Sequence, residues 1–152
     1  MKIMFICTGN ICRSAMAHCM LQDKLAGTEH EVYSCGTYAE DEDSSTFSAI
    51  EVMREYELNL KNHRATNIRN SNIEEMDLIL CMTWSHKNMV LQMYPELKEK
   101  VYTLKEYVNY DETGRDIDIK DPWGYDIEVY RFCAAEIERC INKLTKTIDN
   151  KK

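Results

Sequence analysis

The chain has 152 residues, of which 44% are hydrophobic and 30% charged, and its formal net charge is −7. This length and balance predict one globular domain spanning residues 1–152 and exclude a disordered chain. The acidic charge excludes a general nucleic-acid binder, which needs a surface rich in lysine and arginine, and no apolar run approaches the ~20 residues that span a bilayer. We therefore expect neither a nucleic acid nor a membrane as a partner.

The first part of the chain predicts a strand, a helix and a second strand. Residues Lys2 to Ile6 are apolar and β-prone, which indicates a buried strand. After a polar loop, Ser14 is the expected N-cap of a helix that runs to about Ala26. The second strand is expected from Glu31 to Cys35.

The middle of the chain continues this alternation. Ser44 or Ser45 is the expected N-cap of another helix, whose inner side is predicted to carry Phe47, Ile50, Val52, Met53 and Tyr56. The apolar run from Asp77 to Met82 predicts a strand covered on both faces. A helix is expected from Ser85 to Met93, before Pro95.

The last third begins with a short strand from Lys100 to Thr103 and a helical turn from Leu104 to Val108. A polar, irregular stretch follows, from Asp111 to Pro122. A long amphipathic helix is then expected from Ile127 to Ile148. Its apolar positions are Val129, Phe132, Cys133, Ile137, Cys140, Ile141 and Leu144.

Strands that alternate with helices predict an α/β fold, with a central, mostly parallel four-stranded sheet between two helical layers. In such sheets ligands bind beyond the carboxyl ends of the strands, where the strand order reverses. The loop between the first strand and the first helix is such a place.

This loop has the composition of a phosphate-binding site. Five residues separate Cys7 from Arg13, and Gly9 and Asn10 tolerate the positive φ that lets successive N–H groups converge on an anion. The N-terminus of the following helix adds positive potential, which favours the thiolate form of Cys7, and Ser14 can donate a hydrogen bond to that sulfur. The predicted phosphate-binding residues are Thr8, Gly9, Asn10, Ile11, Cys12, Arg13 and Ser14.

The remaining cysteines predict neither disulfides nor a metal centre. The chain has seven cysteines without a repeated spacing, and its apolar start is too short for a signal peptide. We therefore expect reduced thiols and a cytoplasmic protein. No pair of CxxC elements is present and the four histidines are scattered, so neither a metal nor a cofactor is expected.

The loop resembles the active-site loop of the low-molecular-weight protein tyrosine phosphatases, and the resemblance extends over nearly the whole chain. Further matching segments fall in the family's order: Ser34 to Thr37, Asn62 to Arg64, Asp77 to Met82 and Asp121-Pro122. The resemblance implies a cysteine-dependent phosphatase of the bacterial branch, which also contains protein-arginine phosphatases. Its expected partner is a phosphorylated protein or peptide, and its expected state is a monomer or a weak homodimer.

The resemblance also implies catalytic roles. Cys7 takes the phosphoryl group to form a phosphocysteine, Arg13 binds the phosphoryl oxygens, and Asp121 protonates the leaving oxygen before activating water. Asp118 is the alternative acid.

Other matching positions are expected around this centre. Trp123, with Ile11, forms the apolar wall that receives the substrate side chain, and Tyr38 and Tyr125 are weaker candidates for that wall. Asn10, Ser14, Ser34 and His63 match family positions that hydrogen-bond one another and support the loop. Cys12 matches a position that forms a reversible disulfide with the nucleophile, which implies a redox guard for Cys7.

Four functions remain to be compared. Phosphotyrosine is the preferred substrate, because Ile11 is apolar where arginine-specific family members carry threonine. Phosphoarginine is the main alternative, since the segments from Thr103 to Val108 and from Asp121 to Gly124 look closer to that branch. An arsenate reductase needs a close cysteine pair in mid-chain, and Cys81 has none. A phosphate-binding module without turnover would lack the nucleophile or the acid.

Overall fold

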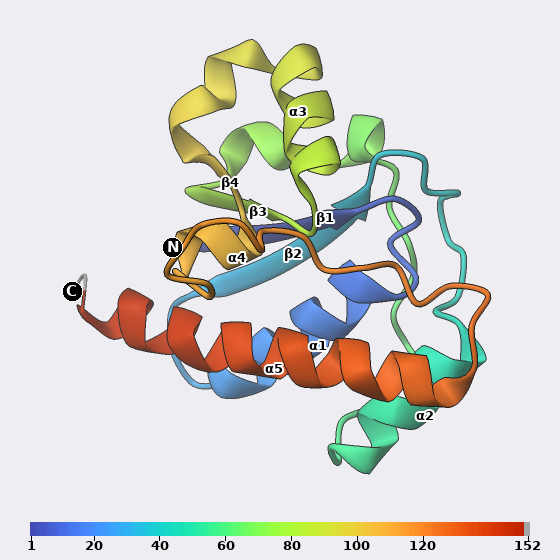
Figure 1. Ribbon diagram of the computed structural model, residues 1–152. Helices are drawn as coiled ribbons and strands as arrows, with labels where there is room; N and C mark the ends of the chain where they lie inside the picture. Colours follow the sequence, from blue (N-terminus) through green and yellow to red (C-terminus); the bar gives the residue numbers. More distant parts are fainter. Residues whose placement is uncertain (151–152) are drawn as a thin grey trace.

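The computed structural model describes residues 1–150 as four parallel strands between two layers of helices (Figure 1). The strands are β1 (Lys2–Cys7), β2 (Glu31–Gly36), β3 (Leu78–Cys81) and β4 (Val101–Thr103). The helices are α1 (Arg13–Lys24), α2 (Phe47–Glu55), α3 (Trp84–Met93), α4 (Leu104–Tyr107) and α5 (Ile127–Asn150), with 3-10 turns at Ile68–Asn70, Ile73–Glu75 and Pro95–Lys100. The predicted α/β fold is confirmed, and every strand pairing among these residues is parallel.

The two inner strands of the sheet are buried on both faces, which explains why β1 after Lys2 and all of β3 are continuous apolar runs. Successive side chains of β1 alternate between two cores. Ile3 and Phe5 pack into the core formed with α1, α2 and α5, whereas Met4 and Ile6 pack into the core formed with α3 and the 3-10 turns. Figure 1 shows α1, α2 and α5 together on one side of the sheet and α3 on the other.

The strand order is β2-β1-β3-β4, which places β1 in the interior of the sheet. The chain leaves β1 to build β2 on one side, and later adds β3 on the other side. The order therefore reverses at β1, so the loop that follows Cys7 lies at the point where α/β sheets bind their ligands.

Two predicted N-caps are wrong. Helix α1 begins at Arg13 after Cys12, and no side chain within the described residues caps it. Ser14 lies inside the first turn, where its hydroxyl is used elsewhere. Helix α2 is capped by Thr46, whose hydroxyl accepts a hydrogen bond from the Ala49 N–H, rather than by one of the two preceding serines.

Two aromatic side chains also differ from their expected positions. Phe47, the first residue of α2, is 75% exposed, and Phe132 of α5 is 67% exposed. Both residues have the spacing expected of the apolar face of their helix, but they lie at the edge of that face, where the side chain is exposed to solvent. The inner residues Val52 and Ile137 are fully buried as predicted.

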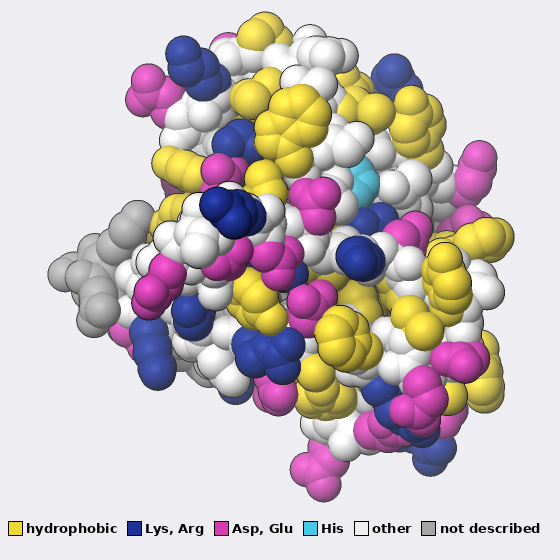
Figure 2. Space-filling model, viewed as in Figure 1, with side chains coloured by type: hydrophobic (Ala, Val, Ile, Leu, Met, Phe, Trp, Pro, Cys, Tyr) yellow, Lys and Arg dark blue, Asp and Glu magenta, His cyan; other side chains and the backbone are white. Residues whose placement is uncertain are grey.

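The distribution of charged side chains on the surface agrees with the acidic net charge of the chain. On the face shown in Figure 2, acidic and basic side chains are interspersed, and Lys and Arg do not gather into one area. Among residues 1–150, no helix combines the length and apolar character that crossing a membrane requires.

Candidate active site

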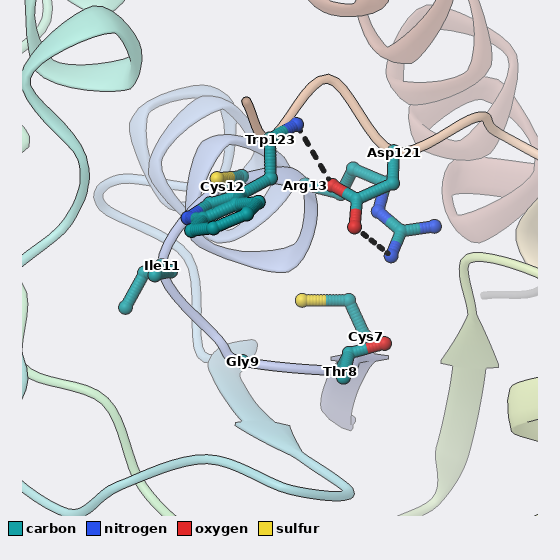
Figure 3. Close-up of a pocket in the computed structure, with 8 residues that line it drawn as sticks. All are labelled: Cys7, Thr8, Gly9, Ile11, Cys12, Arg13, Asp121 and Trp123. Atoms are coloured by element: carbon teal, nitrogen blue, oxygen red, sulfur yellow. Dashed lines mark hydrogen bonds and ion pairs between the residues drawn. The ribbon is translucent and has the colours of Figure 1, made fainter. Parts of the chain in front are cut away.

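A pocket of about 270 Å³ opens at the carboxyl end of β1 (Figure 3). The β1–α1 loop forms its base and one side, and the segment before α5 contributes the rest. Its lining residues are Cys7, Thr8, Gly9, Ile11, Cys12, Arg13, Asp121 and Trp123. The structure thus brings together the three residues expected to be catalytic, although they lie up to 114 positions apart in the sequence (121 − 7).

Cys7 lies at the base of this pocket, and only 2% of the residue is exposed. Its Sγ accepts a hydrogen bond from the Asn10 N–H at 3.3 Å and lies 2.9 Å from Ser14 Oγ. Ser14 Oγ accepts a hydrogen bond from Asn10 Nδ2 at 2.8 Å, so the hydroxyl hydrogen of Ser14 is left for the sulfur. Two donors therefore point at Sγ, which stabilises a thiolate.

Asn10 holds the loop in its curved shape. Its φ of 57° lies in the left-handed region, and the residue is fully buried. Asn10 Oδ1 accepts a hydrogen bond from the Thr66 N–H at 3.0 Å, and its carbonyl oxygen accepts one from His63 Nε2 at 2.9 Å. These bonds offset the cost of the strained backbone, which is on the order of 1–3 kcal/mol. His63 therefore contacts the loop as expected.

Gly36, at the end of β2, allows the loop to pass close to the sheet. A Cβ on this residue would lie 2.4 Å from the Thr8 carbonyl oxygen and 3.0 Å from the Asn10 nitrogen. Both atoms belong to loop backbone, so any side chain here would displace the phosphate loop. The sequence contained this glycine within a family-matching segment but did not indicate its role.

The family resemblance implies that the Ser34 hydroxyl supports the loop directly, but the structure shows a different partner. Ser34 Oγ lies 2.8 Å from Nδ1 of His18, a residue that the sequence patterns did not single out. The His18 ring in turn packs edge-on against His63, with 5.8 Å between the ring centroids. Ser34 therefore reaches the loop only through two histidines, because helix α1 places His18 between them.

Burial lowers the pKa of His18 to about 4, with a smaller contribution from His63. An unfolded histidine has a pKa near 6.5, so between pH 6.5 and 4 the unfolded chain binds more protons than the folded one. The free energy of unfolding therefore falls as the pH falls through this window. We expect His18→Gln to remove part of this fall, on the order of 1–2 kcal/mol between pH 7 and 4.5.

Urea unfolding of both proteins at pH 7 and 4.5 measures this difference. His30→Gln, which alters a histidine that contacts the N-terminal amine instead of His63, should keep the wild-type fall. An unchanged fall in His18→Gln would mean that His18 does not titrate between these values.

The side chain of Arg13 lines the pocket beside Cys7. Its guanidinium is almost fully buried, Nη1 donates to the Ile119 carbonyl oxygen at 2.9 Å, and Nη2 lies 3.5 Å from Asp121 Oδ2. Its Nε is buried and finds no hydrogen-bond partner among residues 1–150. A buried, unpaired N–H on a cation is costly. An anion bound above Cys7 would supply the acceptor.

Asp121 lies across the pocket from Cys7 and is half exposed. Its Oδ1 accepts a hydrogen bond from the Trp123 N–H at 3.0 Å, which fixes the carboxylate over the opening (Figure 3). Asp118, the alternative acid, instead accepts a hydrogen bond from the Trp84 N–H at the start of α3, at 2.7 Å. It does not line the pocket. The geometry therefore favours Asp121 as the acid.

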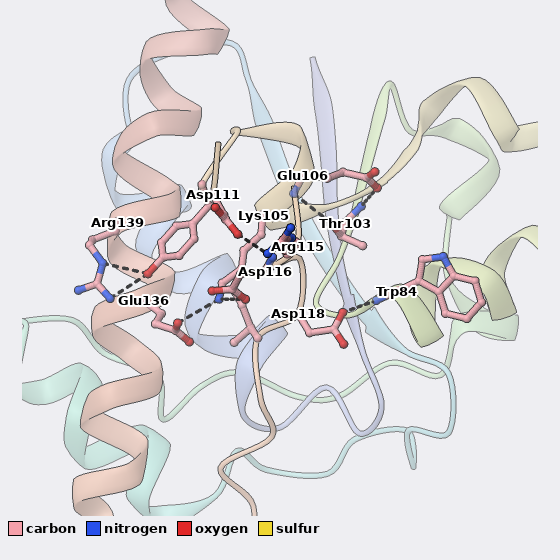
Figure 4. A network of polar contacts seen from close by, with 12 residues as sticks. Trp84, Thr103, Lys105, Glu106, Asp111, Arg115, Asp116, Asp118, Glu136 and Arg139 are labelled. Atoms are coloured by element: carbon pink, nitrogen blue, oxygen red, sulfur yellow. Dashed lines mark hydrogen bonds and ion pairs between the residues drawn. The ribbon is translucent and has the colours of Figure 1, made fainter. Parts of the chain in front are cut away.

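The segment that carries Asp121 is fastened to the body of the protein (Figure 4). Lys105 of α4, which is almost fully buried, pairs with Asp116 at 2.8 Å and with Glu136 of α5 at 3.0 Å. Ile119 donates its N–H to the Met82 carbonyl oxygen at 2.8 Å. These contacts explain how an irregular loop can hold a carboxylate in one place.

The pocket wall is apolar on one side. Ile11 and Trp123 line it, and Trp123 is 64% exposed, so its ring stands at the entrance. Tyr38 and Tyr125 are similarly exposed, but neither lines the pocket. The wall is thus narrower than the sequence candidates suggested.

Cys12 lines the same pocket as a free thiol. Its Sγ lies 3.4 Å from Tyr130 Oη and 3.6 Å from Thr46 Oγ1, and burial raises the pKa of this thiol. Cys12 is therefore held as a neutral thiol beside Cys7. Its suggested role as a redox guard stays a prediction.

Comparison with known proteins identifies the family. The family model described as low molecular weight phosphotyrosine protein phosphatase matches residues 2–152. The chain belongs to this family. The family is one of cysteine-dependent phosphatases, so the chain is a hydrolase of this class, as the resemblance implied.

Individual relatives divide between two substrates. A protein named protein-arginine-phosphatase from Geobacillus stearothermophilus is 38% identical over 148 residues, which cover 97% of this chain and 95% of that protein. A low molecular weight protein-tyrosine-phosphatase, PtpB of Staphylococcus epidermidis, is 31% identical over 146 residues, which cover 95% and 96%.

Solved structures agree with the fold. The YwlE arginine phosphatase from Geobacillus stearothermophilus superimposes with a TM-score of 0.90 at 36% identity, covering 99% of this chain and 94% of that one. A low molecular weight protein tyrosine phosphatase from T. tengcongensis gives a TM-score of 0.88 at 36% identity, covering 97% and 99%.

The structure offers little support for an arsenate reductase or a metal-dependent enzyme. Cys81 is a free, fully buried thiol whose pKa is raised by burial, so it offers no thiolate for a disulfide relay of the arsenate-reductase kind. Among residues 1–150, no three His, Cys, Asp or Glu side chains are grouped to hold a metal ion.

Proposed function

We propose that this chain hydrolyses phosphotyrosine in proteins through a phosphocysteine formed on Cys7. One observation carries the proposal: a buried sulfur with two donors lies at the base of a pocket that Arg13 also lines, and the buried Nε of Arg13 has no hydrogen-bond partner among residues 1–150. The uncapped N-terminus of α1 faces the same place. This arrangement concentrates positive potential where a phosphoryl dianion would bind.

In the first step, the Cys7 thiolate attacks phosphorus and the bond from phosphorus to the tyrosine oxygen breaks. Arg13 and the loop N–H groups neutralise the charge on the three equatorial oxygens. Asp121 gives its proton to the departing oxygen, because a phenolate is costly to expel at neutral pH. The products of this step are tyrosine and phosphocysteine.

In the second step, the Asp121 carboxylate takes a proton from a water molecule that attacks phosphorus. The bond from sulfur to phosphorus breaks, inorganic phosphate leaves, and Ser14 donates its hydrogen bond to the released thiolate. Asp121 is then protonated again and ready for the next substrate. Every proton is accounted for by groups that line the pocket or touch the sulfur.

The choice of tyrosine rests on the apolar wall. Ile11 and Trp123 offer contact area and stacking to a phenol ring. A guanidinium against Ile11 would lose hydrogen bonds to water without gaining new ones. Phosphoarginine remains the second candidate, because two similar proteins bear the name protein-arginine-phosphatase.

A comparison of matched phosphotyrosine and phosphoarginine peptides tests this choice. We expect wild-type kcat/KM to be higher for phosphotyrosine. Ile11→Thr should shift the ratio toward phosphoarginine by about tenfold, the effect of one hydrogen bond to a charged group. Ile11→Val, which keeps a branched apolar side chain, is the matched control and should keep the wild-type ratio. A wild-type preference for phosphoarginine would show that the proposed substrate is wrong, but it would not contradict the proposed chemistry of Cys7.

Four further features belong to the proposal. We infer a single catalytic domain over residues 1–152 that acts in the cytoplasm, where free thiols are maintained, as is consistent with seven free cysteines. The enzyme acts as a monomer or weak homodimer and uses no cofactor, because the thiolate, the arginine and the carboxylate supply the whole reaction.

A further inference from the structure

A row of three polar side chains leads from the start of α3 to the pocket. Thr83, the N-cap of α3, places Oγ1 2.9 Å from Nδ1 of His86. Nε2 of His86 lies 2.8 Å from Oγ1 of Thr8. His86 is only 6% exposed, whereas Thr8 is exposed and lines the pocket beside Cys7 and Arg13. Figure 3 shows Thr8 and Ile11 on different sides of the pocket.

The hydrogen atoms of this row can be counted. Burial, with a smaller contribution from the charge of Arg13, lowers the pKa of His86 to about 4, so the ring is neutral at pH 7 and carries one N–H. Thr83 Oγ1 already accepts a hydrogen bond from the His86 backbone N–H at 3.2 Å. Two arrangements of the remaining hydrogens are then available, and they differ in what Thr8 offers to the pocket.

In the first arrangement the Thr83 hydroxyl donates to Nδ1 and the Nε2–H donates to Thr8 Oγ1. The hydroxyl hydrogen of Thr8 is then left for the pocket. In the second arrangement Nδ1–H donates to Thr83, and the Thr8 hydroxyl donates to Nε2. Thr8 then faces the pocket with lone pairs only. A phosphoryl dianion attracts a hydrogen and repels lone pairs, so its binding favours the first arrangement.

We propose that His86 is a positioning residue for this enzyme: backed by Thr83, it makes the Thr8 hydroxyl a hydrogen-bond donor to a phosphoryl oxygen in the pocket. The inference rests on the proposed function, since it requires an anion above Cys7. It adds a side-chain donor to the backbone donors of the loop. It also gives a reason for burying a histidine behind an exposed threonine.

The tautomer of His86 gives a readout that a purely structural role would not move. In ¹⁵N-histidine-labelled wild-type enzyme at pH 7, saturating inorganic phosphate should leave His86 with a protonated Nε2 and a bare Nδ1. A His86→Gln spectrum assigns the signals. A protonated Nδ1 in the phosphate complex overturns the proposal, because Thr8 would then be donating away from the pocket.

Kinetics supply the second test. Thr8→Val keeps the side-chain shape without the hydroxyl, and should raise the inhibition constant of inorganic phosphate about tenfold, as expected for one hydrogen bond to a charged group. Thr8→Ser should restore the wild-type constant. Thr145→Val, a hydroxyl deletion on α5, is the matched control and should change nothing.

The outcomes separate the two proposals. Equal phosphate inhibition in wild type and Thr8→Val overturns the role of Thr8 and His86 while leaving the Cys7 mechanism standing. Absence of phosphate inhibition in the wild-type enzyme overturns the proposed function, and the inference fails with it.

Discussion

Cys7→Ser should lower kcat by about 10⁴-fold or more while inorganic phosphate still binds. Serine fills the same space and can keep the hydrogen bonds from Asn10 and Ser14. A serine hydroxyl is a far poorer nucleophile than a cysteine sulfur at the same position. The variant therefore separates anion binding from chemistry, and the loss belongs in kcat rather than in affinity.

Stopped-flow release of a chromogenic phenol measures the effect. Wild-type enzyme should show a burst that is stoichiometric with enzyme, because the phosphocysteine forms with release of the phenol, and Cys7→Ser should show none. Cys19→Ser, which alters a half-buried thiol on the first helix outside the pocket, is the control and should retain both the burst and the steady-state rate. Full turnover by Cys7→Ser would reject the mechanism, whereas failure to bind phosphate would show that the loop itself had been disturbed.

The sequence predicted the parts of this site that are local in the chain. The residues that determine the structure of the loop from Cys7 to Ser14 lie within the loop itself. They are a cysteine at the end of a strand, residues that accept positive φ, and an arginine at the start of a helix. The strands were equally clear, because a sheet buried on both faces leaves continuous apolar runs.

The contacts that sequence reasoning missed are tertiary. His18 and His86 touch the loop or its supports only because α1 and α3 bring them there, and a single histidine in a helix gives no signal of its own. Ser34 was assigned to the loop from its family position, yet its hydroxyl meets His18. The need for glycine at position 36 comes from the loop backbone, which passes too close to allow a side chain there.

The acid shows how local and tertiary information combine. The role of Asp121 is what the family resemblance of the Asp121-Pro122 pair implies, and the proline restricts the backbone before it. What keeps its carboxylate over the pocket is distant: Lys105 binds one end of the loop to α5, and Ile119 bridges Met82 and Arg13 near the other. Asp118 was a reasonable alternative from sequence, but its carboxylate is occupied at the N-terminus of α3.

Asp121→Asn should lower kcat on a phosphotyrosine peptide by about 10²- to 10³-fold, the usual contribution of a general acid. Asparagine can still accept the hydrogen bond from the Trp123 N–H, so the loop keeps its shape. The loss should shrink to about tenfold or less on p-nitrophenyl phosphate, whose leaving group needs little protonation. The measurement is kcat on both substrates for wild type and variant.

Asp118→Asn is the matched control for this experiment. Its side-chain oxygen can still accept the bond from the Trp84 N–H, so it should retain most activity on both substrates. The dependence on the leaving group decides the assignment, since only a group that protonates the departing oxygen should matter more when that oxygen is more basic. Equal losses on the two substrates would instead make Asp121 an electrostatic partner of Arg13, which it touches at 3.5 Å. If instead Asp118→Asn lost more kcat on the phosphotyrosine peptide than on p-nitrophenyl phosphate, and Asp121→Asn did not, Asp118 would be the general acid.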